Sequence, residues 1–116
     1  MKLIRFGACG DERPGLIDDT GTLRDLGSVI KDWDYQTLVP ETLATVAELD
    51  PQTLPAVSAK TRLAAPVHRA GKIVGCALTY GKHAAEAGME PPAEPMFMLT
   101  AASAINGPHD EVMMPK

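Results

Sequence analysis

The stretch YGKHAAEAG, residues 80–88, holds the side chains best able to handle a proton. His83 and Glu86 are three residues apart, so on a helix they lie on one face and can meet. The Glu86 carboxylate could then hold the His83 ring in the tautomer that accepts a proton from water, as in a general base. Spacing alone favours the alternative, two polar side chains on a solvated turn, because this spacing occurs in many exposed helices.

The remaining histidines do not predict a metal site built by this chain alone. His68, His83 and His109 form no H-x-x-x-H pair, and none has a cysteine at the spacing of a zinc site. The sequence also lacks the G-x-S-x-G, G-x-G-x-x-G and P-loop motifs. Serine-hydrolase and nucleotide chemistry are therefore not indicated.

The two cysteines are expected to be free thiols. Cys9 and Cys76 lie far apart and have no partners at metal-like spacing, which is typical of a reducing compartment and predicts a cytoplasmic protein. Cys76 lies within an apolar run, where a cysteine is usually a small buried hydrophobe. We therefore expect Cys76 to be buried.

Composition and charge are those of about one small globular domain. Of the 116 residues, 45% are hydrophobic and 22% are charged, which argues against disorder and fibrous repeats. The net charge is −4 and the Lys and Arg residues are dispersed, so we expect no nucleic-acid partner. No apolar run approaches the roughly 20 residues of a spanning helix, and the first residues soon turn polar, so we expect neither a membrane partner nor a signal peptide.

A small β-meander and one short helix are expected to precede the candidate dyad. KLIRFG predicts a strand with Ile4 and Phe6 on one face. LID and LRDL flank DTG, in which Gly21 can adopt the positive φ of a tight hairpin turn. Residues 40–49, PETLATVAEL, predict a helix that begins at a proline, has one apolar face and ends before Pro51.

A change of composition separates this first unit from a second one. Between Pro51 and Pro66 the sequence is rich in Pro, Ala, Ser and Thr, which is typical of a linker. We place the boundary near residues 60–70. The predicted domains are therefore 1–65 and 66–116.

The second unit is expected to begin a sheet that it does not complete. GKIVGCALTY predicts a largely buried strand, and HAAEAG predicts one or two helical turns stopped by Gly88. MFMLTAASAI is ambiguous between strand and helix, but the flanking Pro95 and Asn106 favour a strand, and its methionines are expected in a core or an interface. Uncovered strand edges and apolar faces would need a partner chain or a missing remainder of this one.

Taken in order, these blocks resemble the fumarylacetoacetate hydrolase (FAH) family. MKLIRFG and ERPGLID are similar to the small N-terminal domain of many bacterial members, and GKIVGCALTYGKHAAEAG, EPMFM, SAINGP and VMMP are similar to the start of the catalytic domain. The resemblance covers nearly the whole chain. It implies an α+β chain, with a small N-terminal β-meander and a short helix over 1–65, then the first strands and short helix of a β-rich FAH-type roll over 66–116.

The resemblance also implies a chemistry. Family members use a divalent metal, usually Mg²⁺, and act on small dicarbonyl or keto-acid compounds by C–C bond hydrolysis, decarboxylation or isomerisation, as in aromatic catabolism. The family's Tyr-x-x-His-x-x-Glu element is matched by Tyr80, His83 and Glu86. This match implies that His83 and Glu86 activate water and that Tyr80 is a candidate for substrate binding.

The same resemblance sets what this chain is expected to lack. The family's metal-binding carboxylates lie downstream of the matched blocks, so no metal ligand is expected here, and Asp110 and Glu111 do not match them. We therefore expect the chain alone to be inactive. Its expected partners are a keto-acid or dicarbonyl substrate and either a second copy, since members are commonly dimeric, or a chain that completes the catalytic domain.

Two positions depart from the family pattern and leave a second hypothesis open. Thr79 stands where the family has an asparagine, and Leu99 stands where it has a lysine. Both changes remove polar groups from the expected pocket. The alternative function is a noncatalytic binding or scaffold subunit that pairs with a complete family member.

Overall fold

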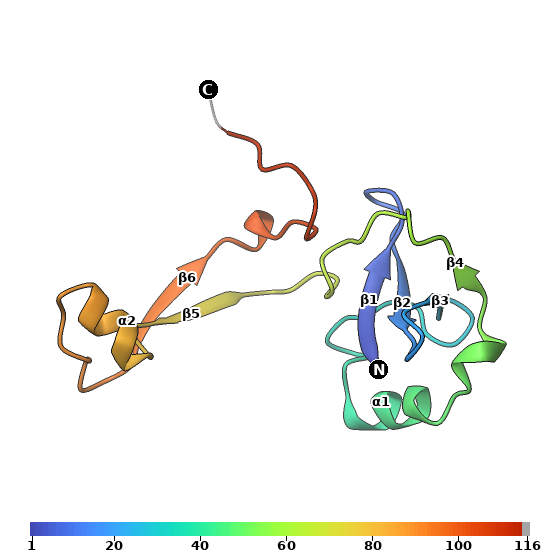
Figure 1. Cartoon of the computed structure of the whole chain (residues 1–116), viewed down its shortest axis with the longest axis horizontal. Helices are drawn as coiled ribbons and strands as arrows, with labels where there is room; N and C mark the ends of the chain where they lie inside the picture. The colour runs from blue at the N-terminus through green and yellow to red at the C-terminus, as the bar shows by residue number, and fades with distance from the viewer. Residues whose placement is uncertain (115–116) are drawn as a thin grey trace. The chain divides into compact units, whose positions relative to one another are not determined.

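The structure, a computed structural model, describes residues 1–114 and forms two compact units. Unit 1 comprises Met1–Ala70 and the segment from Ile105 onward, and unit 2 comprises Gly71–Ala104. Figure 1 shows unit 1 around strands β1–β4 and unit 2 around strands β5 and β6. The chain therefore leaves unit 1 after Ala70 and returns to it at Ile105. Dividing the sequence at one point, as in the predicted domains, does not include this return.

Unit 1 is built on a four-stranded antiparallel sheet in the order β1-β2-β3-β4. The strands are β1 Lys2–Phe6, β2 Arg13–Ile17, β3 Leu23–Asp25 and β4 Ala56–Val57. The strand predicted from KLIRFG and the hairpin predicted around DTG are confirmed. Gly21 has a φ of +85° in the β2–β3 turn, which glycine adopts without the steric cost of a Cβ atom.

Apolar side chains pack on both faces of this sheet. One buried cluster contains Leu16, Leu26, Trp33, Val46 and Leu54, and the other contains Ile4, Phe6 and Leu23. Gly15 lies where a Cβ atom would stand 2.9 Å from the Phe6 ring, so glycine lets this ring pack directly against β2. The Trp33 indole N–H donates to the Gly15 carbonyl at 3.0 Å and fixes the centre of the first cluster.

The predicted helix of unit 1 is confirmed as α1, Pro40–Ala47, which is followed by the 3₁₀ turn η1, Pro51–Thr53. Val46 is buried in the first cluster, and the partly buried Leu43 and Leu49 pack against it. These are the three residues of the expected apolar face. Asp50 ends the segment, and its carboxylate accepts a hydrogen bond from the Gln52 N–H at 2.9 Å.

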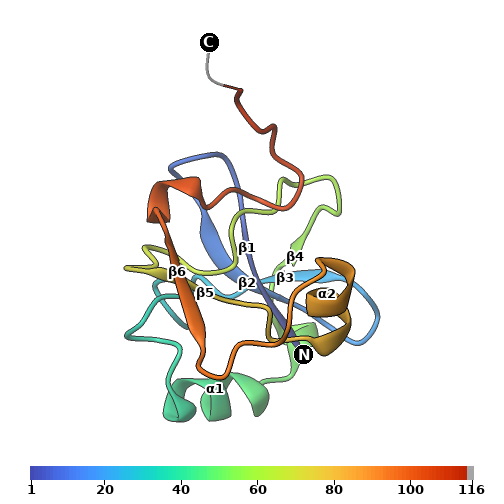
Figure 2. The same cartoon turned by 90° about the vertical axis from the view of Figure 1, so that its left-hand side faces the viewer.

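Unit 2 consists of a two-stranded antiparallel sheet with a short helix between its strands. Figures 1 and 2 show β5 and β6 side by side. The elements are β5 Ile73–Ala77, α2 Gly81–Glu86, β6 Met96–Thr100 and the 3₁₀ turn η2 Ala102–Ala104. The expected helix and the strand reading of MFMLT are confirmed, and Gly88 follows α2 with a φ of +66°.

Two expectations about unit 2 are wrong. The β5 segment was expected to be largely buried, but its residues are half-buried or exposed, and Cys76 is exposed. The physical reason is that an apolar run predicts burial only if a covering layer packs on it. Within unit 2, Ala84 is the only described residue that is buried. The methionines of β6 are exposed and not packed in a core of unit 2, so their expected place in an interface stays a prediction.

None of the helices in residues 1–114 has the length and apolar character needed to cross a membrane.

Candidate functional site

Helix α2 and its N-cap residue carry the candidate catalytic and substrate-binding residues that were predicted from the sequence. Tyr80 is its N-cap residue, with an extended backbone, and the Tyr80 carbonyl accepts a hydrogen bond from the Ala84 N–H at 3.1 Å. The buried Ala84 is the apolar anchor of the helix, and Gly88 at positive φ ends it. This short helix therefore places His83 near its middle and Glu86 at its last residue, about one turn apart.

His83 and Glu86 lie on the same helix, but the described residues show no polar contact between the two side chains. His83 and Glu86 are both exposed, and no hydrogen bond or ion pair between them is found in the described part of the chain. The Tyr80 side chain is 77% exposed. The helix therefore supplies the side chains in the right order, and a further contact must orient the ring before it can act as a general base.

The backbone that leads into α2 is strained. Leu78, between β5 and α2, has a φ of +55°, in the left-handed region that residues with a Cβ atom rarely adopt. Such a conformation costs about 1–2 kcal/mol for a residue other than glycine. Backbone strain of this kind clusters near functional sites, and here it lies three residues before the start of the helix that carries the candidate dyad.

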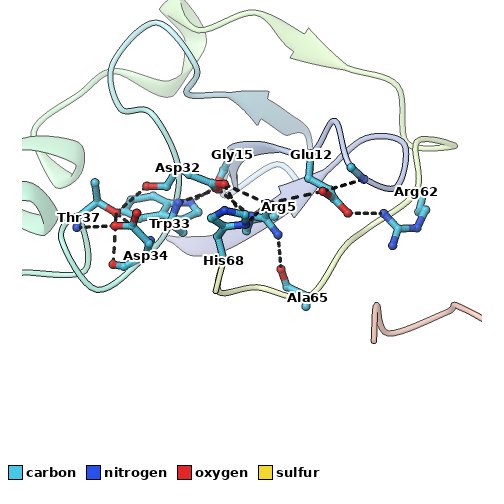
Figure 3. Close-up of polar contacts among 11 residues, drawn as sticks. Arg5, Glu12, Gly15, Asp32, Trp33, Asp34, Thr37, Arg62, Ala65 and His68 are labelled. Atoms are coloured by element: carbon cyan, nitrogen blue, oxygen red, sulfur yellow. Dashed lines mark hydrogen bonds and ion pairs between the residues drawn. The ribbon is translucent and has the colours of Figure 1, made fainter. Parts of the chain in front are cut away.

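A second cluster of titratable side chains, in unit 1, was not found from the sequence. Figure 3 shows Arg5 at its centre, with its guanidinium making two hydrogen bonds to the Asp32 carboxylate at 2.6 and 2.9 Å. The Arg5 Nη2 atom also lies 3.2 Å from His68 Nδ1, and Nη1 donates to the Ala65 carbonyl at 3.4 Å. His68 Nδ1 also lies 3.6 Å from the Asp32 carboxylate, so Arg5, Asp32 and His68 form one polar cluster.

The same network reaches a second arginine. Arg62 donates to both Asp110 oxygens at 2.8 and 2.6 Å, to the Gly7 carbonyl at 3.0 Å and to Glu12 at 3.3 Å. The hydrogen bonds from Arg62 hold the pKa of the Asp110 carboxyl below its usual range. Asp110 thus fastens the returning segment to unit 1.

The cavity beside Arg5 is lined mainly by charged side chains. Its volume is about 540 Å³, and its charged lining combines Arg5, Lys31 and Arg69 with Glu12, Asp32 and Asp34. Within the described residues, no buried side-chain nitrogen or oxygen lacks a hydrogen-bond partner. The buried polar groups of the wall are therefore satisfied within the protein.

The described part of the chain does not by itself offer a ligand set for a divalent metal ion. In residues 1–114, no group of three or more His, Cys, Asp or Glu side chains is arranged to hold one. Mg²⁺ takes oxygen ligands, usually one or two carboxylates together with water and substrate oxygens. No step of the chemistry below is therefore assigned to a metal.

Comparison with known proteins gives the clearest functional indication. Over all 116 residues the chain is 44% identical to a protein of Burkholderia ambifaria strain MC40-6, 45% identical to one of Burkholderia multivorans and 43% identical to one of Burkholderia orbicola strain MC0-3. Each of these relatives is named "Putative hydrolase". The match takes in 100% of this chain and 41% of each relative. No protein-family model matches the chain.

The chain is thus similar throughout to proteins named as hydrolases, and it spans less than half of their length. The similarity indicates hydrolysis in general but no particular reaction, because the names of the relatives give no substrate and no metal. It includes unit 1 as well as the dyad-bearing unit 2.

Proposed function

We propose that this chain is the N-terminal part of a hydrolase of the FAH family, in which His83 and Glu86 activate water against a small dicarbonyl or keto-acid substrate. The observation that carries the proposal is the identity of 44% over the entire chain to a protein named as a hydrolase. The family assignment and the substrate class rest on the sequence resemblance, with the Tyr-x-x-His-x-x-Glu element on α2 as its chemical part.

Among the reactions of the family, the names of the relatives favour hydrolysis. For an acylpyruvate, water adds to the acyl carbonyl and the bond between that carbon and the neighbouring methylene breaks. The acyl group leaves as a carboxylic acid. The methylene carbon takes a proton, and pyruvate forms. His83 would accept the proton of the attacking water, and Glu86 would hold the ring in the accepting tautomer.

Exposure of the dyad agrees with a chain that is inactive alone. His83 and Glu86 lie on the surface of α2, where water screens both groups and neither is fixed. In the proposed enzyme, the rest of the polypeptide would cover α2 and orient the ring. The Mg²⁺ that the resemblance implies would likewise take its ligands from outside this chain.

An exchange experiment tests the dyad. In the B. ambifaria relative, the 116 matched residues are replaced by this chain, which gives what we call the exchange protein. We expect it to cleave an acylpyruvate in the presence of Mg²⁺. His83→Asn and Glu86→Gln should each lower kcat by about 10²–10⁴-fold, the usual contribution of a general base. The kcat of the double variant should be no lower than that of the less active single variant, because the two residues act as a unit.

The matched control is His109→Asn, an exposed histidine outside the proposed machinery that should leave kcat unchanged. Circular dichroism would establish that all variants fold. A folded exchange protein in which the His83 and His109 variants have equal kcat would contradict the dyad. A folded but inactive exchange protein would favour the competing function, a noncatalytic subunit, for which Thr79 and Leu99 are the supporting residues.

A further inference from the structure

One face of the β5–β6 sheet is apolar and open. In the antiparallel register, Val74 is opposite Leu99 and Cys76 is opposite Phe97, so these four side chains share a face that we call the Val74–Leu99 face. Val74 is 54% exposed, Phe97 is 70% exposed and Leu99 is 79% exposed, and Cys76 is also exposed. None of the four carries a charge.

The opposite face is half open. Ile73, Gly75 and Ala77 of β5 are half-buried, whereas their partners on β6, Thr100, Met98 and Met96, are exposed. The Val74–Leu99 face differs in that all four of its side chains are exposed. A two-stranded sheet is at best marginally stable in water, and clustered exposed apolar side chains usually mark a surface that another layer covers.

The size of this face argues against a second copy of the chain as its cover. Four side chains offer at most a few hundred Å², whereas a stable protein–protein interface takes about 800 Å² from each partner. A layer within the same polypeptide needs no such area, because packing inside one chain does not cost the translational and rotational entropy that two separate molecules lose on association. The relatives supply the length for such a layer, since the match covers only 41% of each.

We propose that the Val74–Leu99 face is an internal packing surface, covered by an apolar layer from the part of the polypeptide that lies outside the matched 41% of the relatives. The covering side chains would be aliphatic or aromatic, because the face offers no charge and no polar side chain besides one thiol. This inference rests on the proposed function in one respect, that the chain belongs to a longer polypeptide. Cys76, in the centre of the face, would then be buried.

The two cysteines provide a test with a built-in control. Both thiols are free and exposed in this chain, and Cys9 lies in unit 1, away from the face by sequence and by unit. The labelling rate of each with a maleimide is measured by peptide mass spectrometry, in the 116-residue chain and in the exchange protein. We expect both to react in the chain alone. In the exchange protein, Cys76 should react at about one tenth of its rate in the chain alone, or more slowly still, because a buried thiol reacts only when the structure opens locally. Cys9 should keep its rate.

Three results would overturn the inference. Equal labelling of Cys76 in the two proteins would show that the face stays open in the longer polypeptide. Protection of Cys76 in the chain alone that grows with protein concentration would show a second copy as the cover. Protection at every concentration would show that this chain already covers the face. If the exchange prevents folding, the chain is mixed with the separately produced remainder of the relative, and the same two rates are measured.

A companion substitution checks the chemistry of the cover. Leu99→Asp should leave the circular dichroism of the chain alone unchanged, because the side chain is mostly exposed there. In the exchange protein it should prevent protection of Cys76, since an aspartate cannot be buried without a partner. Retained protection would contradict an apolar cover. In the exchange protein without this substitution, protection of Cys76 without hydrolase activity would reject the proposed function and keep this inference, and activity without protection would do the reverse.

Discussion

At the residue scale, the most completely bonded carboxylate of unit 1 is that of Asp18, in the β2–β3 turn. It accepts hydrogen bonds from the Thr20 hydroxyl at 2.6 Å, from the Thr20 and Thr22 N–H groups at 2.9 Å and from Arg24 at 2.9 Å. The hydrogen bond from the Thr20 hydroxyl contributes most to holding the pKa of Asp18 well below its usual value. The charged carboxylate is therefore part of the folded turn.

This lowered pKa predicts how stability depends on acid. A carboxyl whose pKa is lower folded than unfolded stabilises the fold above its unfolded pKa, near 4, and loses that contribution as pH falls through the folded pKa. We expect the free energy of unfolding to fall between about pH 5 and pH 2, and to fall less steeply in Asp18→Asn. Urea titrations followed by the fluorescence of Trp33, the only tryptophan, measure both slopes.

The neighbouring Asp19→Asn is the control for this prediction. Asp19 is exposed, and its side chain makes no hydrogen bond within the described part of the chain. It should leave the slope of the wild-type protein in place. Parallel slopes for wild type and Asp18→Asn would show that the Asp18 network does not link folding to pH.

The ion pairs also show why the polar network of unit 1 could not be predicted from the sequence. Arg5 and Asp32 are 27 positions apart, and Arg62 and Asp110 are 48 positions apart. No local pattern selects such partners, because only the folded sheet brings them together. His83 and Glu86 could be found because their relation is local to one helix, yet whether they contact each other depends on what covers that helix.

At the element scale, Gly21 contributes to the turn between β2 and β3 through its backbone conformation alone. Gly21 has a φ of +85°, and a Cβ atom added there would meet nothing within 4 Å. Gly21→Ala should therefore lower the free energy of unfolding by about 1–2 kcal/mol, the cost of the left-handed region for a residue with a Cβ atom. Urea unfolding followed by Trp33 fluorescence measures the change.

The control for the turn uses asparagine, a residue type that tolerates this conformation better than alanine does. Gly21→Asn should cost less than Gly21→Ala, because asparagine adopts positive φ more readily. The order glycine, asparagine, alanine in stability is the expected result. Equal stability of the alanine variant and wild type would show that the turn relaxes to another conformation.

Several elements followed from local patterns, while their burial did not. The proline at the start of α1, the glycine after α2 and the alternation in β1 are local signals, and these elements form where expected. The apolar run of β5 gave the strand correctly but not its environment, since burial needs a second layer. Cys76 is exposed for the same reason.

At the scale of the whole molecule, the two units differ in how complete their packing is. Unit 1 has buried clusters on both faces of its sheet, whereas the buried residue within the described part of unit 2 is Ala84 alone. The matched stretch is 41% of the B. ambifaria relative, so the rest of such a protein is long enough to supply the proposed layer over the Val74–Leu99 face. The FAH-type roll remains a prediction, to be realised in that longer polypeptide.

The central claim is that water, activated by a dyad on this chain, cleaves a carbon–carbon bond in the longer protein. The most direct measurement is cleavage of an acylpyruvate by the exchange protein in ¹⁸O-labelled water, with mass analysis of the products. We predict that the carboxylic acid carries one labelled oxygen from the attacking water, and that His83→Asn forms almost none of this acid. An acid without the label, or equal yields from wild type and His83→Asn, would contradict the claim.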